Sequence, residues 1–160
     1  MHPEIREYRP SDEERVVELA LRAWTPVFES IGQLLGTEIF TRLHGDWRDY
    51  QSNAVRTTLA DDRTRAWVAE LEQGVSGFVT AKLDRERGLG EITMLAVDPE
   101  AQDRGIGGAL TEFATDWLRR SGVAVAMVET GGDRGHTAAR RVYEKAGYTA
   151  LPVVRYFKAL

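Results

Sequence analysis

The segment that most constrains this chain is a glycine-rich turn that joins an apolar strand to a helix. Residues 91–97 have the pattern of a β-strand and residues 106–120 that of a helix, with Gly105, Gly107 and Gly108 at their junction. Glycine lets the backbone turn tightly and lets a ligand approach its N–H groups. The first N–H groups of a helix lack partners and lie at the positive end of its dipole, so they bind anions. The junction therefore predicts a pyrophosphate site, the alternative being a helix that is merely capped by glycines.

Two common phosphate-binding motifs do not fit this turn. A dinucleotide-binding G-x-G-x-x-G motif that starts at Gly105 needs a glycine where the chain has Leu110. A P-loop needs Gly-Lys-Ser or Gly-Lys-Thr, and the chain has Gly107-Gly108-Ala109. The turn is therefore expected to bind its anion in another structural context.

The pattern of the whole chain, residues 1–160, predicts a single domain of mixed α/β class without repeats or linkers. Strands are expected at residues 5–9, 65–71, 75–83, 91–97, 123–129, 148–151 and 153–158, and helices at residues 12–24, 32–45, 106–120 and 137–146. Thr25-Pro26 is expected to end the first helix, because proline removes a helical N–H group. Residues 47–59 are compatible with a helix but do not require one.

Composition and charge exclude several classes of protein. The absence of cysteine excludes disulfide scaffolds, cysteine-ligated zinc, iron–sulfur clusters and thiol nucleophiles. The longest apolar run, residues 123–128, is far shorter than the roughly 20 residues of a membrane span, and the N-terminus lacks a secretory signal, so a cytoplasmic protein is expected. A net charge of -4 without a basic run argues against nucleic-acid binding. The spacing of His2, His44 and His136 predicts no metal site.

Two motifs in order resemble the GNAT superfamily of N-acetyltransferases. Gln102-x-x-Gly105-x-Gly107 is similar to the acetyl-coenzyme-A signature of that family, and the segment from Ala139 to Tyr148, which reads A-x-x-x-Y-E-K-A-G-Y, resembles its second signature. The resemblance covers residues 65–158 well, and the first sixty residues only in the order of their elements. It implies the GNAT fold, a central mixed sheet with two splayed parallel strands flanked by helices, and acetyl-coenzyme A as cofactor.

The resemblance assigns cofactor contacts to three parts of the chain. The backbone of Leu95, Ala96 and Val97 would contact the pantetheine arm. The following turn would bind the pyrophosphate, mainly through main-chain N–H groups; it comprises Gln102, Asp103, Arg104, Gly105, Ile106, Gly107 and Gly108. His136 stands where the family usually has asparagine, either as a cofactor contact or as a solvent-exposed residue at a helix start.

The resemblance also implies the catalytic groups. A lysine-like amine of pKa about 10.4 needs about 4.6 kcal/mol to lose its proton at pH 7, so a base is useful. Glu91 matches the glutamate base of the histone-acetylating branch, and Glu129 is the rival. The N–H group of Leu95 would stabilise the oxyanion. Tyr143 would return a proton to the departing thiolate and would also contact the cofactor.

The acceptor is expected to be an amine on a small molecule or a peptide. Trp24, Phe28 and Glu29 lie in the family's variable helical segment, and Tyr156 lies near the end of the chain. Residues 1–80 hold 9 basic and 14 acidic residues, so a cationic acceptor is expected if this half faces it. The missing cysteine leaves direct transfer in a ternary complex as the expected route. The resemblance allows a homodimer, and the alternatives are a non-catalytic acyl-coenzyme-A-binding module and a peptide-interaction module.

Overall fold

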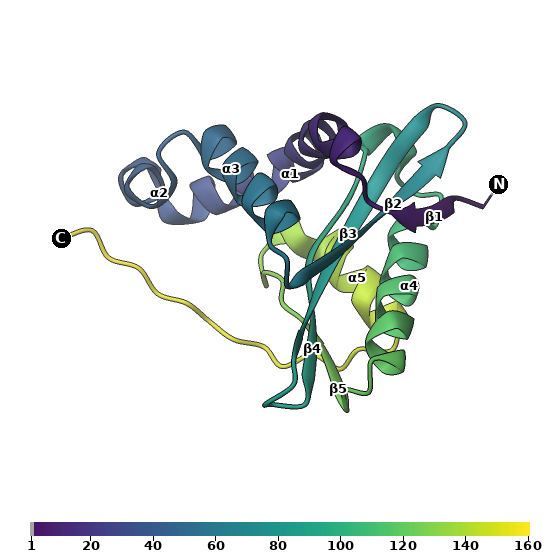
Figure 1. Cartoon of the computed structure of the whole chain (residues 1–160). Helices are drawn as coiled ribbons and strands as arrows, with labels where there is room; N and C mark the ends of the chain where they lie inside the picture. The colour runs from purple at the N-terminus through teal and green to yellow at the C-terminus, as the bar shows by residue number, and fades with distance from the viewer. Residues whose placement is uncertain (1) are drawn as a thin grey trace.

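A five-stranded sheet in the order β1-β2-β3-β4-β5 organises the molecule in the computed structural model, which describes residues 2–160 (Figure 1). Neighbouring strands are antiparallel except β4 and β5, which are parallel. The strands are β1 (Glu4–Glu7), β2 (Thr64–Leu71), β3 (Gly74–Asp84), β4 (Leu89–Val97) and β5 (Val125–Val128), and the α-helices are α1 (Glu13–Leu35), α2 (Thr37–His44), α3 (Trp47–Ala60), α4 (Ile106–Arg120) and α5 (Thr137–Lys145). This arrangement confirms the mixed α/β fold with a central mixed sheet flanked by helices.

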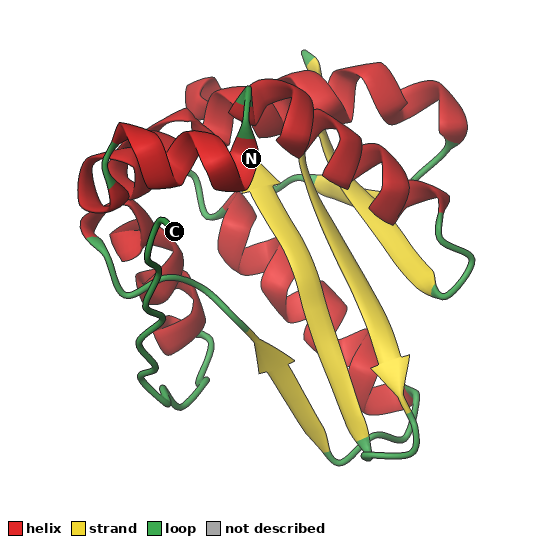
Figure 2. Ribbon diagram, turned by 90° about the vertical axis from the view of Figure 1, so that its left-hand side faces the viewer, coloured by secondary structure: helices red, strands yellow, loops and turns green. Residues whose placement is uncertain are grey.

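Alternation of side chains along the strands builds two apolar layers, one on each face of the sheet. On β2, Trp67 and Ala69 point to the face covered by α4, and Val68 between them points to the face covered by α1 and α3. Leu110 of α4 fills the first layer and Leu19 of α1 fills the second. Figure 2 shows α1, α2 and α3 grouped at one end of the strands, away from α4.

The parallel strands β4 and β5 splay apart, as the resemblance implies. Pairing runs from Leu89 opposite Val125 to Ile92 opposite Val128, and then the two strands separate. A β-bulge lies at the same place, because Thr80 of β3 pairs with Met94 whereas the next β3 residue pairs with Ile92. A bulge bends the strand that carries it, so it turns the second half of β4 away from β5.

The first helix does not end at Thr25-Pro26, and this prediction is wrong. Helix α1 continues through Pro26 to Leu35 and ends at Gly36, whose φ of 78° is in the left-handed region. The hydroxyl of Thr25 donates to the Leu21 carbonyl at 2.7 Å, and the next turns are held by the burial of Phe28. The apolar face of the helix therefore outweighs the single hydrogen bond that proline removes. Residues 47–60 form a helix as well.

The two closing strands expected at residues 148–151 and 153–158 are also absent from the described structure. Residues 148–160 form an extended segment without strand pairing (Figure 1), and Leu151 and Tyr156 are 85% and 90% exposed. The local pattern of apolar and β-branched residues predicts a strand, but pairing also needs a partner edge, which sequence pattern does not provide. No helix among residues 2–160 has the length and apolar character needed to cross a membrane.

Candidate active site

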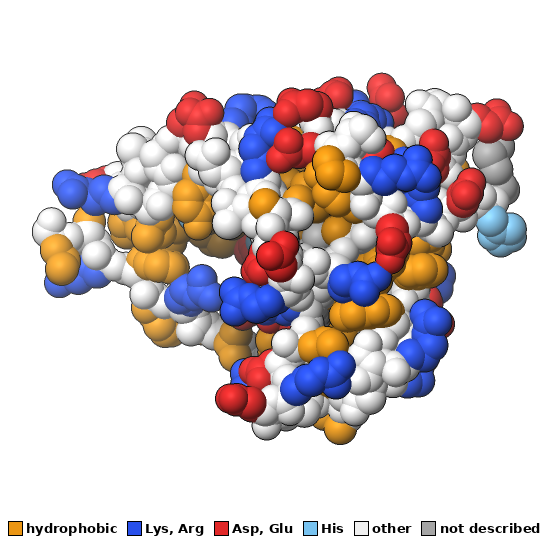
Figure 3. Space-filling view, in the orientation of Figure 1, with side chains coloured by type: hydrophobic (Ala, Val, Ile, Leu, Met, Phe, Trp, Pro, Cys, Tyr) orange, Lys and Arg blue, Asp and Glu red, His pale blue; other side chains and the backbone are white. Residues whose placement is uncertain are grey.

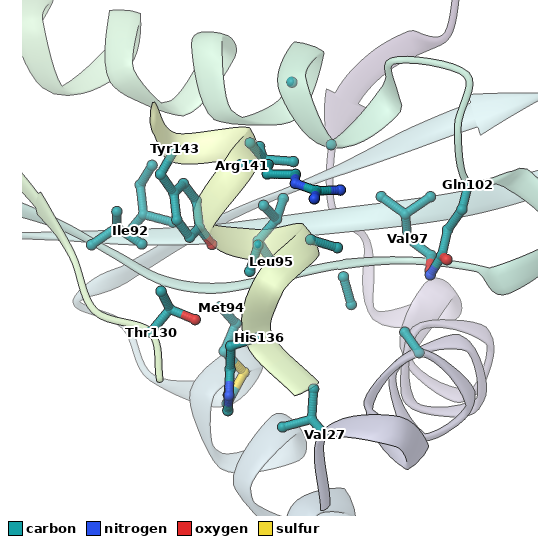
Figure 4. Close-up of a pocket in the computed structure, with 18 of the residues that line it drawn as sticks. Val27, Ile92, Met94, Leu95, Val97, Gln102, Thr130, His136, Arg141 and Tyr143 are labelled. Atoms are coloured by element: carbon teal, nitrogen blue, oxygen red, sulfur yellow. The ribbon is translucent and has the colours of Figure 1, made fainter. Parts of the chain in front are cut away.

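A cavity of about 970 Å³ lies between the separated half of β4, the starts of α4 and α5, and helix α1 (Figure 4). Its β4 wall begins at Ile92, where pairing with β5 ends, and continues to Val97. Figure 3 shows the molecule hollowed between the α1–α3 side and the C-terminal segment, with hydrophobic side chains around the hollow. The cavity thus begins where β4 and β5 separate.

The second half of β4 presents unpaired backbone to this cavity. Residues 94–97 pair with β3 on one side and, within the described chain, with no strand on the β5 side. Leu95, Ala96 and Val97 all line the cavity, and the Val97 carbonyl accepts a hydrogen bond from Gln102 Nε2 at 3.1 Å. This is the stretch to which the resemblance assigns the pantetheine arm.

The turn that follows β4 is held by a buried carboxylate. Asp98 is 2% exposed and accepts hydrogen bonds from Arg15 at 2.7 Å, from Arg22 at 3.1 Å and from the Glu100 N–H at 2.9 Å. Burial alone would raise the pKa of Asp98, but the Glu100 N–H and the two guanidinium groups lower it below its ordinary value. The two arginines belong to α1, so this contact ties α1 to the end of β4.

The glycine turn leaves the start of α4 open. Gly105 caps the helix in the left-handed region with a φ of 79°, and no side chain among residues 2–160 caps the first N–H groups. A side chain at Gly108 would meet nothing within 4 Å, and Asp103 has a positive φ of 63°. The expected pyrophosphate residues line the cavity with the exception of Arg104; those present are Gln102, Asp103, Gly105, Ile106, Gly107 and Gly108.

Tyr143 lies across the cavity from β4, on α5. Its side chain is buried, and its ring packs edge-on against Tyr148 with 6.2 Å between ring centroids. Burial, followed by the nearby Tyr148, raises the pKa of Tyr143 to about 12. Figure 4 shows its hydroxyl directed away from α5 toward the side where Leu95 and Thr130 lie. The phenol is therefore protonated at neutral pH and faces the cavity.

His136, at the start of α5, also lines the cavity, and its side chain is only 19% exposed. Its Nδ1 atom contacts Asp133 Oδ1. The other oxygen of Asp133 accepts from the Ser30 hydroxyl at 2.5 Å and from the Gly135 N–H at 3.1 Å. Ser30 and Asp133 were not predicted from the sequence. The one local signal is the position of Asp133 in a glycine-rich loop before His136, which is compatible with a paired carboxylate.

The two candidate bases are placed differently. Glu91 does not line the cavity; it precedes Ile92 on the paired half of β4, and its carboxylate lies 4.0 Å from Lys82 Nζ. Glu129 does line the cavity, but its side chain is 60% exposed and lies 3.8 Å from Arg155.

The four candidate acceptor residues are not brought together. Trp24 and Phe28 line the cavity from α1, where Trp24 packs against Phe78 and Phe28 stacks on Trp47 with 4.6 Å between centroids. Glu29 lines a separate, smaller hollow between α1 and α2. Tyr156 lies in the exposed C-terminal segment and does not line the cavity.

Comparison with known proteins identifies the class to which this fold and site belong. The model of the acetyltransferase (GNAT) family matches residues 15–148, which include both signatures and the whole cavity wall. The chain therefore belongs to the GNAT family of acetyltransferases.

Individual relatives agree with this family. A mycothiol acetyltransferase of Sanguibacter keddieii is 31% identical over 155 residues, which are 93% of this chain and 44% of the relative. Among solved structures, an aminoglycoside N-acetyltransferase in complex with coenzyme A has a TM-score of 0.67 at 17% identity, covering 99% of this chain and 95% of its own. An N-acetyltransferase of Thermoplasma acidophilum, also in complex with coenzyme A, has a TM-score of 0.64 at 18% identity, covering 91% and 88%. This chain spans less than half the length of the curated relatives it matches.

Proposed function

We propose that the protein transfers an acetyl group from acetyl-coenzyme A directly to a primary amine. One observation carries the proposal: a single cavity joins the unpaired half of β4, the open glycine turn at α4 and the hydroxyl face of Tyr143. The family supplies the reaction class, and two family structures that share this fold contain coenzyme A.

The residues present fit coenzyme A. The uncapped N–H groups at the start of α4 suit a pyrophosphate, and the open space above Gly108 admits it. The backbone of residues 93–97 offers hydrogen bonds to the amide groups of a pantetheine arm. When bound, acetyl-coenzyme A supplies the activated acetyl group as a thioester. The N–H group of Leu95 is our candidate for the donor that stabilises negative charge on the carbonyl oxygen during attack.

Tyr143 holds the proton that the leaving thiolate needs. A phenol of pKa about 12 is roughly 3.5 units less acidic than an ordinary thiol of pKa about 8.5, so the transfer is uphill by about 5 kcal/mol in a direct comparison. The burial that raises the pKa of the phenol would also raise the pKa of a thiol held beside it. The difference between the two pKa values would therefore be smaller. The hydroxyl is therefore a workable proton donor at neutral pH.

Glu91, the base that the resemblance implies, has no direct place in the cavity wall. In this role it would act through a chain of water molecules leading from the acceptor amine.

The acceptor is proposed to be a small-molecule amine bound on the α1 side of the cavity, beside Trp24 and Phe28. Two observations support a small molecule: the relatives named above are a mycothiol acetyltransferase and an aminoglycoside acetyltransferase, and this part of the wall is largely apolar. The acidic first half of the chain favours a cationic acceptor. A peptide amine is the alternative acceptor. A homodimer and a cytoplasmic location are also proposed.

Calorimetry with acetyl-coenzyme A, followed by a thiol-release screen over polyamines, aminoglycosides, amino sugars, amino acids and a basic peptide, tests this function. We expect binding, and thiol release with at least one cationic small amine. Binding without release with any amine would favour a non-catalytic acyl-coenzyme-A-binding module. Capture of the basic peptide without acetylation would favour an interaction module, and neither binding nor release would overturn the proposal.

A further inference from the structure

We propose that Asp133 and His136 form the pair that accepts the proton of the acceptor amine, with Nε2 of His136 as the accepting atom. This inference rests on the acetyl transfer proposed above and names the group that starts it. It differs from the roles expected for His136 from the sequence, a cofactor contact or an exposed helix-start residue.

The contact with Asp133 decides which ring nitrogen is free. A carboxylate only accepts hydrogen bonds, so Nδ1 of His136 carries the hydrogen in its contact with Asp133 Oδ1. In the neutral ring, Nε2 then has an available lone pair. Within residues 2–160 no protein group hydrogen-bonds Nε2, and the ring lines the cavity. This is the state that a general base requires.

The pair is held by contacts from two distant parts of the chain. The Ser30 hydroxyl of α1 donates to Asp133 Oδ2 at 2.5 Å, and the Gly135 N–H donates to the same oxygen at 3.1 Å. Arg140 closes the loop by donating to the carbonyls of Gly131 at 2.7 Å and of Asp133 at 2.6 Å. These contacts hold the carboxylate against the ring.

Two glycines, Gly131 and Gly135, have no side chain where the Asp133–His136 pair and Ser30 lie. A Cβ atom on Gly131 would overlap both Asp133 Oδ1 and His136 Nδ1, and one on Gly135 would lie 2.7 Å from Ser30 Cβ. The loop can therefore wrap this closely around the pair only with glycine at these positions.

The charged group in direct contact with the ring is the carboxylate of Asp133. Burial would raise the pKa of Asp133, but the hydrogen bonds from Ser30 and His136 lower it, so the carboxylate is charged when the ring takes up a proton. From the other elements packed here, α1 contributes the neutral Ser30, β4 contributes only uncharged residues, and α5 contributes Arg140, which is engaged with carbonyls. Glu129 and Arg141 also lie in the cavity wall.

The geometry separates the proton acceptor from the proton donor. His136 directly precedes the first residue of α5 and Tyr143 lies seven residues later in that helix, which places them about 10 Å apart along its axis. Figure 4 shows the imidazole next to Met94, on the Thr130 side of α5, with Tyr143 and Leu95 lying side by side farther along the cavity. An amine that enters from α1 would thus meet His136 before it reaches the thioester site.

The step balances in protons and bonds. The ammonium group gives one proton to Nε2 of His136, and the neutral amine forms a C–N bond to the acetyl carbon as the C–S bond breaks. As the amide forms, the nitrogen gives its second proton through water to the Tyr143 oxygen, and the departing thiolate takes the proton of the Tyr143 hydroxyl. His136 then releases the first proton to water. Both side chains return to their starting states with the net release of one proton to water.

The main test compares the pH dependence of kcat/KM for His136→Asn with that of the wild type. Asparagine is the usual residue at this position in the GNAT family, and it retains a hydrogen-bonding group. The Kd for coenzyme A should therefore change less than threefold. At pH 7 we expect kcat/KM to fall about 100-fold or more. The rate of the variant should then rise about tenfold per pH unit toward the amine pKa of about 10.4, where no base is needed.

Two further variants define the pair and the control. Asp133→Asn should retain the fold and lose about 10-fold or more in kcat/KM, because an amide can fix the wrong ring tautomer. His2→Asn removes an exposed imidazole far from the cavity and should leave the rate unchanged. Circular dichroism and coenzyme A binding confirm that each variant is folded.

A measurement without turnover completes the test. Long-range ¹H–¹⁵N spectra should show hydrogen on Nδ1 of His136 in the neutral wild type and a shift toward Nε2–H in Asp133→Asn. An Nε2–H tautomer in the wild type, or a His136→Asn rate at pH 7 within threefold of wild type, would overturn the inference. If the wild type itself neither binds acetyl-coenzyme A nor releases thiol, the proposed function fails instead.

Discussion

At the scale of single residues, the proposed proton donor Tyr143 can be tested by removing its hydroxyl group. Tyr143→Phe removes the hydroxyl and retains the buried ring, so we expect kcat to fall about 10²-fold while coenzyme A affinity stays within threefold. Thiol release and calorimetry measure the two quantities. Tyr50→Phe, which removes a phenol on the exposed side of α3, is the matched control. Equal kcat for Tyr143→Phe and wild type would exclude the hydroxyl as the proton donor.

Asp98 governs stability and its dependence on pH. Its pKa is lowered in the folded protein, so its contribution is present above the unfolded carboxyl value and is lost as pH falls through the lower folded value. Asp98→Asn should lower the free energy of unfolding by about 2 kcal/mol at pH 7. Urea unfolding from pH 7 to pH 3 should show a shallower loss in this variant than in the wild type.

Glu100 provides the control for Asp98. Its side chain is 81% exposed and lies 3.7 Å from Arg22, so Glu100→Gln should change stability by less than about 1 kcal/mol. A loss for Asp98→Asn no greater than that for Glu100→Gln would show that the buried ion pairs do not hold α1 to the turn.

At the scale of elements, a substitution at the start of α4 should raise the stability of the protein and lower its affinity for coenzyme A. Gly108→Ala meets no atom within 4 Å and fills a helical position, so it should stabilise the unliganded protein by about 0.5–1 kcal/mol. The added methyl group would stand where the pyrophosphate approaches, so coenzyme A affinity should fall about 10-fold. Urea unfolding and calorimetry measure the two effects.

A glycine in another helix separates these two effects. Gly32 in α1 also has room for a Cβ atom, with Phe40 the nearest side chain at 3.8 Å. Gly32→Ala should raise stability by a similar amount and leave coenzyme A affinity unchanged. If Gly108→Ala binds coenzyme A as tightly as Gly32→Ala does, the turn does not hold the pyrophosphate.

The same elements show what the sequence could and could not predict. The glycine turn and the motif ending at Tyr148 are local, so the order of elements and the cofactor side of the cavity follow from them. The site depends elsewhere on long-range contacts: Asp98 meets Arg15 and Asp133 meets Ser30 over separations that no local pattern encodes. The expected break at Pro26 and the closing strands failed for the same reason, because packing and pairing decide them.

At the scale of the whole molecule, cofactor binding should be measurable as stability. A ligand present at 100 times its Kd adds about 2.7 kcal/mol to the free energy of unfolding. For a domain of this size that corresponds to a rise in Tm of roughly 6–10 °C. Thermal unfolding with increasing acetyl-coenzyme A should show this rise, and a Tm that is insensitive to the cofactor would contradict the proposed site.

The separation of β4 from β5 has a consequence for how the molecule comes apart. Beyond Ile92 the backbone groups of β4 on the side of β5 pair with no strand among residues 2–160, and we call this open edge the seam. A small molecule bearing amides, rather than a further strand, would close that seam. In the unliganded protein, rupture under denaturant or force should then begin along this line, separating β5 and α5 before the antiparallel strands yield. The cofactor would thus supply the missing hydrogen-bonding partner of β4. The cofactor concentration would then set the lifetime of the folded protein.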